Sequence, residues 1–285
     1  MIKKIEWSCF GLCNEITSDY LALQLGLYQP FIINEENVDQ IEAYMKAPKK
    51  LQFDSYCIEC KKESTFKFLT QRGGIPAYPP EYRPTNFLDR IKSDSPITLL
   101  FQCQRDGSHL FYFSLLIRGN KVTKIGQYPS LADLQLHKID RYRKILSDDY
   151  RDFSKAIRLN SQEIGAGSFV YLRRIFENLI EETRQTAAAQ EPQWDNSIFD
   201  RLKMDEKIKQ LKNYLPEFLV QNRQLYAILS KGIHELTEKE CLDLFPNVQL
   251  AIELILDEKI HQQEKQKKIS SVQKFVSATI DRLKS

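Results

Sequence analysis

Three cysteines and one histidine in the first half of the chain have the residue types and spacing of metal ligands. Cys57 and Cys60 form a CxxC pair, and five residues separate Cys103 from His109. The CxxC spacing lets two thiolates hold one ion from a tight turn. If the two pairs converge, they make a tetrahedral Cys3His site for zinc. All four ligands would then come from the protein, so we expect the zinc to be structural, with no open position for a catalytic water.

The second pair of ligands flanks a predicted β-hairpin. Residues 97–101 and 110–117 have the composition of strands, and Asp106 and Gly107 mark the turn between them. Such a turn places residues from the end of one strand and the start of the next at the same end of the hairpin. Hence the sequence predicts that Cys103 and His109 lie together.

The remaining cysteines leave alternatives open. Cys9 and Cys13 form a CxxxC on a segment with a helical pattern, where they could replace a ligand, serve a second site or face the core; we favour the core. Cys241 is expected to be a core thiol. Unrelated buried thiols or a redox pair would also explain the CxxC. The first residues lack an apolar signal core, so we expect a cytoplasmic, reducing location, where cysteines bind metals more often than they form disulfides.

Composition bounds the class of protein. The chain has 285 residues, of which 42% are hydrophobic and 28% charged, with a formal net charge of +3. This balance is typical of a globular protein with one large or two ordinary domains. No apolar run approaches the roughly 18 residues that span a bilayer, so no membrane partner is expected. The small net charge excludes a supercharged nucleic-acid coat, but allows a local basic patch.

The pattern along the chain predicts an α+β protein with two parts. Residues 1–129 should combine two helices, over 5–27 and 34–46, with a β-rich region over 51–127 that carries the metal site. Residues 130–285 should form an α-helical bundle. The predicted strands lie at 65–69, 97–101, 110–117 and 122–125, with a Gly/Pro-rich loop over 72–84. The predicted helices lie at 130–145, 148–159, 166–187, 197–213, 215–230, 238–262 and 270–283, with a hinge over 185–197.

Two arginines on the predicted helix over 166–187 are candidate site residues. Arg173 and Arg174 could contact an anion or RNA, since guanidinium groups fit phosphate, but Glu177 is placed to pair with Arg173 in a structural ion pair. Gly165 and Gly167 at the helix start favour close packing over phosphate binding.

The corner around His234 is the other candidate. Gly232 should end one helix, and Thr237 and Glu240 form a capping box for the next, so His234 should lie between helices. A histidine there can perform acid–base chemistry, although local bonding is the commoner role. The segment 261–285 is basic and predicts a solvated helix face or a contact with an acidic partner or nucleic acid.

Two segments resemble a known family. The run Tyr171-Leu172-Arg173-Arg174-Ile175-Phe176-Glu177 and the Ser230-Lys231-Gly232-Ile233-His234 corner resemble the HEPN-like helical domains of prokaryotes, over roughly residues 148–262. This resemblance implies a helical bundle that is often dimeric. Many members are ribonucleases of toxin–antitoxin, CRISPR and anti-phage systems, and others are inactive binding modules. The four candidate metal ligands separately make the first half similar to a zinc ribbon.

The resemblance is incomplete at its catalytic motif. Active members carry an arginine separated by four to six residues from the histidine, whereas Ala227, Ile228 and Leu229 stand at these positions before His234. We therefore expect a non-enzymatic or catalytically degenerate protein of a phage-defence or stress system. It would be a homodimer that binds RNA, DNA or a partner protein. The alternatives are a ribonuclease that uses His234 with Arg173 or Arg174, and a scaffold subunit of a multiprotein complex.

Overall fold

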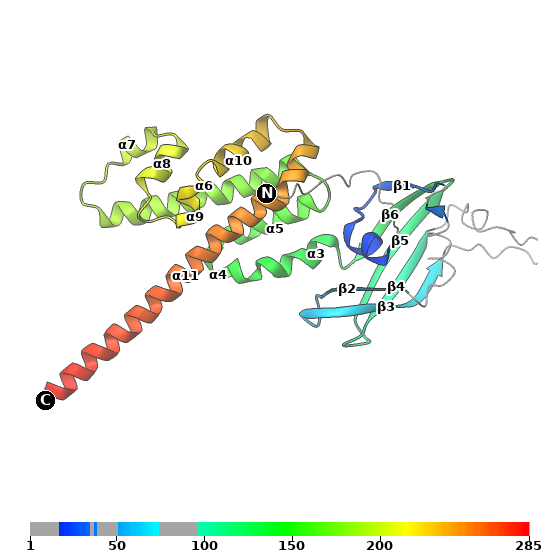
Figure 1. Cartoon of the computed structure of the whole chain (residues 1–285), viewed down its shortest axis with the longest axis horizontal. Coiled ribbons are helices and arrows are strands. Elements are labelled where there is room, and N and C mark those ends of the chain that lie inside the picture. Colours follow the sequence, from blue (N-terminus) through cyan, green and yellow to red (C-terminus); the bar gives the residue numbers. More distant parts are fainter. Residues whose placement is uncertain (1–16, 35–36, 39–50, 74–95, 285) are drawn as a thin grey trace, which may run out of the picture. The chain divides into compact units, whose positions relative to one another are not determined.

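The computed structural model of the chain describes residues 17–34, 37–38, 51–73 and 96–284, which form two compact units with a boundary after His137 (Figure 1). The first unit is dominated by a β-sheet and the second by helices, so the α+β class is confirmed. Cys9, Cys13 and most of the predicted helix over 34–46 and loop over 72–84 lie outside the described residues.

The sheet of the first unit has six antiparallel strands in the order β1-β6-β5-β4-β3-β2. The four predicted strands lie within β3 to β6, and β1 and β2 are additional. The strands are β1 (Pro30–Ile32), β2 (Gln52–Cys57), β3 (Lys62–Gly73), β4 (Ile97–Cys103), β5 (Leu110–Arg118) and β6 (Lys121–Tyr128). Gly119 has a φ of 61° in the two-residue turn between β5 and β6, a conformation that glycine adopts without strain.

One face of this sheet is an aromatic core. Alternate residues of β2 to β5 point to it because side chains alternate along a strand. Phe53 lies at its centre, with ring centroids 4.8 Å from Phe111, 5.0 Å from Phe101 and 5.6 Å from Phe66. Leu134 of the short helix α3 (Leu131–Leu136) joins the same cluster. Ser130 caps the start of α3, since its Oγ accepts a hydrogen bond from the backbone N–H of Asp133.

A lysine is buried on the same face. Lys124 donates from Nζ to the carbonyl oxygens of Leu21 at 2.6 Å and Leu25 at 3.0 Å, and so caps the short π-helix η1 (Tyr20–Gln24). Burial lowers the pKa of Lys124 to about 7. The helix predicted to reach residue 27 ends earlier, because Leu25 has extended backbone and the chain then turns into β1.

The second unit is a set of packed helices. The 3-10 turn η3 (His137–Tyr142) begins at the boundary between the units. The helices that follow it are α4 (Arg143–Leu146), α5 (Asp149–Asn160), α6 (Gly165–Gln190), α7 (Asn196–Arg201), α8 (Met204–Gln210), α9 (Glu217–Gln221), α10 (Leu225–His234) and α11 (Glu238–Lys284). Helix α6 packs against α5, α10 and α11. No helix among the described residues combines the length and apolar character that crossing a membrane requires.

Several predicted helix boundaries are wrong. The predicted helices over 238–262 and 270–283 are one helix, α11, since the residues between them are helix formers without Gly or Pro. The predicted hinge over 185–197 begins too early, because the alanine run continues α6 to Gln190. The predicted helices over 197–213 and 215–230 are each broken into two short helices.

Glycines at the α6–α10–α11 junction serve packing. Gly232 does not end α10 but lies inside it, where an added Cβ would lie 2.0 Å from Cδ1 of the buried Phe169. Gly165 lies against α11, and a Cβ there would lie 2.7 Å from Cβ of Cys241. The preference for close packing over phosphate binding at Gly165 is therefore confirmed. Cys241 is buried, as predicted.

Candidate metal centre

The sheet topology brings the two pairs of predicted ligands to one place. Cys57 is the last residue of β2 and Cys60 lies in the turn to β3; Cys103 is the last residue of β4, and His109 directly precedes β5. Since β3 and β4 are antiparallel neighbours, the β2–β3 turn and the β4–β5 turn lie at the same end of the sheet. The pairing of Phe66 with Cys103 sets this register.

The four ligand atoms form a compact cluster in which all lie within 4.8 Å of one another. Sγ of Cys60 is 3.8 Å from Sγ of Cys103 and 3.1 Å from Nδ1 of His109, and Sγ of Cys57 is 3.7 Å from the same nitrogen. In a tetrahedral zinc site with bonds of about 2.3 Å to sulfur and about 2.0 Å to nitrogen, adjacent sulfurs lie about 3.8 Å apart, and sulfur and nitrogen about 3.5 Å apart. The cluster therefore has the dimensions of a site that could hold a metal ion.

The imidazole is oriented by carboxylates on its far side. Nε2 of His109 lies 3.3 Å from Oε2 of Glu59 and 3.6 Å from Oδ2 of Asp106. The N–H group at Nε2 can then donate a hydrogen bond to Glu59. In this tautomer the lone pair of Nδ1 points toward the sulfurs. This carboxylate–histidine arrangement is the usual outer shell of metal-binding histidines. The sequence contains its signal, because Glu59 lies inside the CxxC, but ligand spacing alone did not single it out.

Hydrogen bonds also reach the sulfurs. The backbone N–H of Cys60 donates to Sγ of Cys57 at 3.4 Å, and Oγ of the buried Ser64 lies 3.1 Å from Sγ of Cys103. Such bonds favour a thiolate. Sequence reasoning missed Ser64, which joins the site only because β3 lies beside β4.

The thiols differ in acidity. Burial opposes ionisation of Cys103, but hydrogen bonds from Ser64 and from the backbone of Asp106 and Arg105 lower its pKa to about 7. Burial, then hydrogen bonds and charges from Cys57 and Cys103, raise the pKa of Cys60 to about 12. Of these two thiols, Cys103 therefore ionises more readily than Cys60.

The turns that carry the ligands are braced. Nε of Arg105 donates to the carbonyl oxygen of Glu63 at 2.6 Å, and the backbone N–H of Gln104 donates to that of Thr65 at 3.0 Å, so the two turns are joined directly. Lys61, after the second cysteine, has a φ of 54°, which bends the chain back into β3. These contacts hold the two ligand-bearing turns side by side.

The candidate residues of the helical unit do not form a comparable site. Nε of Arg173 donates to Oε1 of Glu177 at 2.8 Å, which confirms the predicted ion pair, and its guanidinium lies 5.3 Å from the ring centroid of Tyr226. Arg174 pairs with Asp152 at 3.1 Å. Both guanidinium groups are thus engaged by carboxylates.

His234 lies at a different level of the helix pair. It is exposed at the end of α10. Arg173 of α6 contacts Tyr226 of α10, and His234 lies eight residues beyond Tyr226. Eight residues of α-helix correspond to about 12 Å. This spacing along α10 separates His234 from the level of Arg173. The predicted capping box beside it is present, since Thr237 N–H donates to Oε2 of Glu240 at 2.8 Å and Glu240 N–H to Oγ1 of Thr237 at 3.3 Å.

The start of α6 already holds an anion from the protein itself. Oε2 of Glu238 accepts hydrogen bonds from the backbone N–H groups of Gly165 at 2.5 Å and Ala166 at 3.1 Å. A carboxylate at this position satisfies free N–H groups and suits the helix dipole. The contact therefore links α6 to α11 and occupies the place that a phosphate would take.

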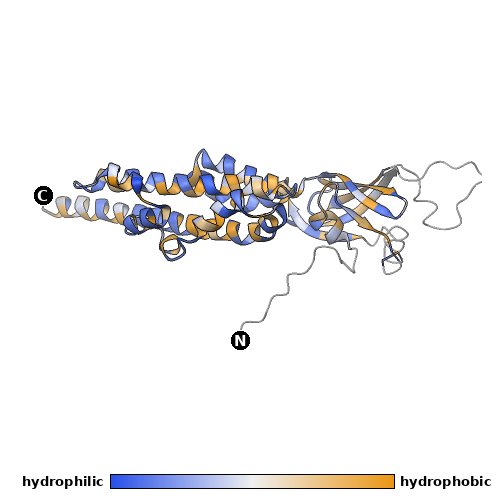
Figure 2. Cartoon of the chain, turned by 90° about the horizontal axis from the view of Figure 1, so that it is seen from above, coloured by the Kyte–Doolittle hydropathy of each residue, from blue (hydrophilic) through white to orange (hydrophobic). Residues whose placement is uncertain are grey.

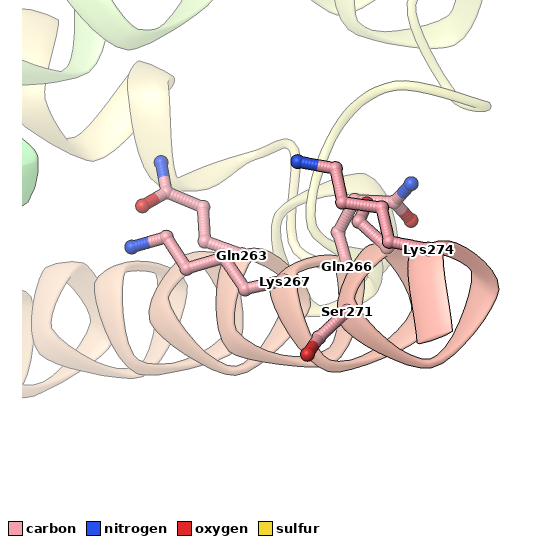
Figure 3. A pocket seen from close by; sticks show the side chains of 6 residues that line it. Gln263, Gln266, Lys267, Ser271 and Lys274 are labelled. Atoms are coloured by element: carbon pink, nitrogen blue, oxygen red, sulfur yellow. The ribbon is translucent and has the colours of Figure 1, made fainter. Parts of the chain in front are cut away.

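Two hollows lie in the helical unit. One is a shallow surface of α11 lined by glutamine, lysine and serine side chains of that helix alone, among them Gln263, Lys267 and Lys274 (Figure 3). The other is a cavity of about 480 Å³ lined by α6, α9, α11 and the segment 213–216, and its charged pair, Glu182 and Lys259, is a closed ion pair. The hydroxyl groups of Thr183 and Thr186 in the second lining donate to backbone carbonyl oxygens of α6, so its polar side chains serve the packing of the helices.

Comparison with protein-family models, with curated proteins and with solved structures finds no match to this chain. Among the described residues, the Cys3His cluster is the arrangement that indicates a specific chemistry, the binding of a metal ion. Four protein ligands can fill a tetrahedral coordination sphere.

Proposed function

We propose that Cys57, Cys60, Cys103 and His109 bind one structural zinc ion that holds the two turns of the sheet together. The observation that carries this proposal is the meeting of three sulfurs and one imidazole nitrogen within 4.8 Å of one another, which is close enough for all four to bind one ion. The carboxylate of Glu59 behind the imidazole supports it. Since no ligand position remains for water, the zinc stabilises the fold and does not activate a substrate.

Metal analysis of the purified chain tests the zinc site. We expect one zinc per chain in the wild type and none in Cys57→Ser/Cys60→Ser. Cys241→Ser, which removes a buried thiol of the helical unit, is the control and should keep its zinc. Metal-free wild-type protein, or equal zinc content in all three proteins, would contradict the proposal.

We further propose that the chain is a catalytically degenerate, HEPN-like protein of a phage-defence or stress system that binds nucleic acid through its zinc-bearing unit. The solvent-facing side of the sheet supports this choice. Tyr112 and Tyr128 are cross-strand neighbours whose rings stack at 5.6 Å and remain about 40% exposed, and Lys67 and Lys121 are exposed on the same side. Exposed aromatic rings stack with bases, and lysines bind phosphate.

Binding of fluorescent single-stranded RNA and DNA over a salt series tests this function. We expect affinity to fall as salt rises, because phosphate contacts release counterions. Tyr112→Ala should weaken binding by about tenfold, consistent with the loss of one stacked base. Tyr28→Ala, which removes a 71% exposed ring from another part of the unit, should leave it unchanged. Absence of binding at low salt would refute nucleic-acid recognition and favour the scaffold alternative.

The proposed function has no catalytic step. RNA incubated with the wild type should stay intact, in agreement with the separation of His234 from Arg173 along the helix pair. Cleavage by the wild type that disappears in His234→Ala would overturn this part of the proposal and restore the ribonuclease alternative.

A further inference from the structure

The last part of α11 carries apolar side chains that face solvent. Figure 1 shows this end of the helix continuing away from the other helices of its unit, and Figure 2 shows hydrophobic residues along it. Within the bundle, the first half of α11 buries its apolar side chains, such as Phe245, Ile252 and Leu256. The exposed side chains, with their exposed fractions, are Ile269 (40%), Val272 (60%), Phe275 (70%), Val276 (45%), Ile280 (44%) and Leu283 (77%).

These side chains follow the heptad pattern of a coiled coil. Ile269, Val276 and Leu283 occupy successive a positions, and Val272 and Thr279 occupy the d positions between them. The 3-4 spacing keeps all five on one stripe of the helix. Most of the side chains in the hollow of Figure 3, such as Lys267 and Lys274, lie on the polar side of the same helix.

The flanking positions indicate which partner fits. In a parallel pair of identical helices, each g residue faces the e residue of the next heptad on the other chain. Lys268 would then face Gln273 of the second copy, and Phe275 would face its Ile280, so the register contains an apolar contact and no repulsion. An antiparallel pair is less favourable, because Lys268 would face Arg282 and the a-position Leu283 would face Lys265.

We propose that residues 268–283 of α11 form a parallel coiled coil with a second copy of this chain. The seam stops toward the bundle, because Lys265 and Gln262 occupy the preceding d and a positions and the helices would separate there. Two heptads bury a small area, so the pair should dissociate on dilution. This inference does not depend on zinc or on nucleic-acid binding.

Mass measured by light scattering and sedimentation over a concentration series tests the proposal. The wild type should approach twice the monomer mass of 33.4 kDa at high concentration and return to it on dilution. Val272→Glu/Val276→Glu should remain monomeric, with association weakened by at least about 100-fold. Ser271→Glu/Ser277→Glu adds the same charge on the polar side and should associate like the wild type. All four positions are exposed, so the variants should fold.

Gln273→Glu tests the orientation. In the parallel pair it adds two ion pairs with Lys268, and the dissociation constant should fall roughly fivefold. In an antiparallel pair it would place two glutamates opposite each other and weaken association. Weakening by Gln273→Glu, a wild type that is monomeric at every concentration, or a dimer that survives Val272→Glu/Val276→Glu would overturn the proposal. A monomer that binds vesicles containing phosphatidylserine would assign the stripe to a membrane surface instead.

Discussion

Gly232→Ala should destabilise the helical unit, although the same change normally stabilises a helix. Replacing glycine by alanine inside a helix contributes about 1 kcal/mol in favour of folding. Against this, the new Cβ would lie 2.0 Å from Cδ1 and 2.7 Å from Cε1 of Phe169. Carbon atoms in contact prefer about 3.5 to 4.0 Å, so the ring would have to retreat by about 1.5 Å. Phe169 is fully buried, so a shift of its ring displaces neighbouring core side chains.

The magnitude follows from comparing the two effects. Overpacking a core costs about 1 to 3 kcal/mol, and a displacement of this size in a fully buried ring belongs at the upper end. After subtraction of the helix-propensity gain, we expect a loss of about 2 kcal/mol in the free energy of unfolding.

Urea unfolding followed by far-ultraviolet circular dichroism measures this loss. Phe169→Leu and the double variant complete a double-mutant cycle. Because the smaller side chain leaves room for Cβ, the double variant should be more stable than the sum of the single effects by at least about 1 kcal/mol. A Gly232→Ala protein as stable as the wild type, or additive effects in the cycle, would refute the described packing of α10 on α6.

Three other perturbations test separate contacts. Glu59→Gln should weaken zinc binding by about 10- to 100-fold in a chelator competition, whereas Glu63→Gln, which removes the same charge at the start of β3, should not; equal affinities would show that the carboxylate behind the imidazole is unimportant. Lys124 binds its proton more weakly when folded, with a pKa of about 7 against an ordinary value of 10.5. Between these two pH values the unfolded chain therefore binds more protons than the folded chain, so the free energy of unfolding should rise with pH. From about pH 7 to about 10.5 this rise should be a few kcal/mol larger in the wild type than in Lys124→Met. Parallel pH profiles of the two proteins would contradict this. Glu238→Gln should lower the stability of the helical unit by about 1 kcal/mol in thermal unfolding, because a carboxylate that accepts two N–H groups at a helix start is lost; an unchanged melting temperature would count against that cap.

Local chemistry made much of the fold predictable. Four strands, the turn at Asp106-Gly107 and the cap at Thr237 depend on neighbouring residues, so the sequence pattern identifies them. Boundaries that depend on distant contacts were predicted wrongly. Gly232 has the appearance of a helix end, but the ring of Phe169 is what requires a glycine there.

The candidate metal centre divides in the same way. The four residues with the chemistry of ligands can be identified from the sequence, because CxxC spacing and a hairpin turn are local properties. The tertiary structure brings the two pairs together, because the antiparallel pairing of β3 with β4 places both turns at one end of the sheet. It also decided that Ser64 reaches a sulfur and Glu59 the imidazole, and that His234 and Arg173 lie at different levels of a helix pair. These relations join residues far apart in the chain, and the register and packing that create them are set by the whole core.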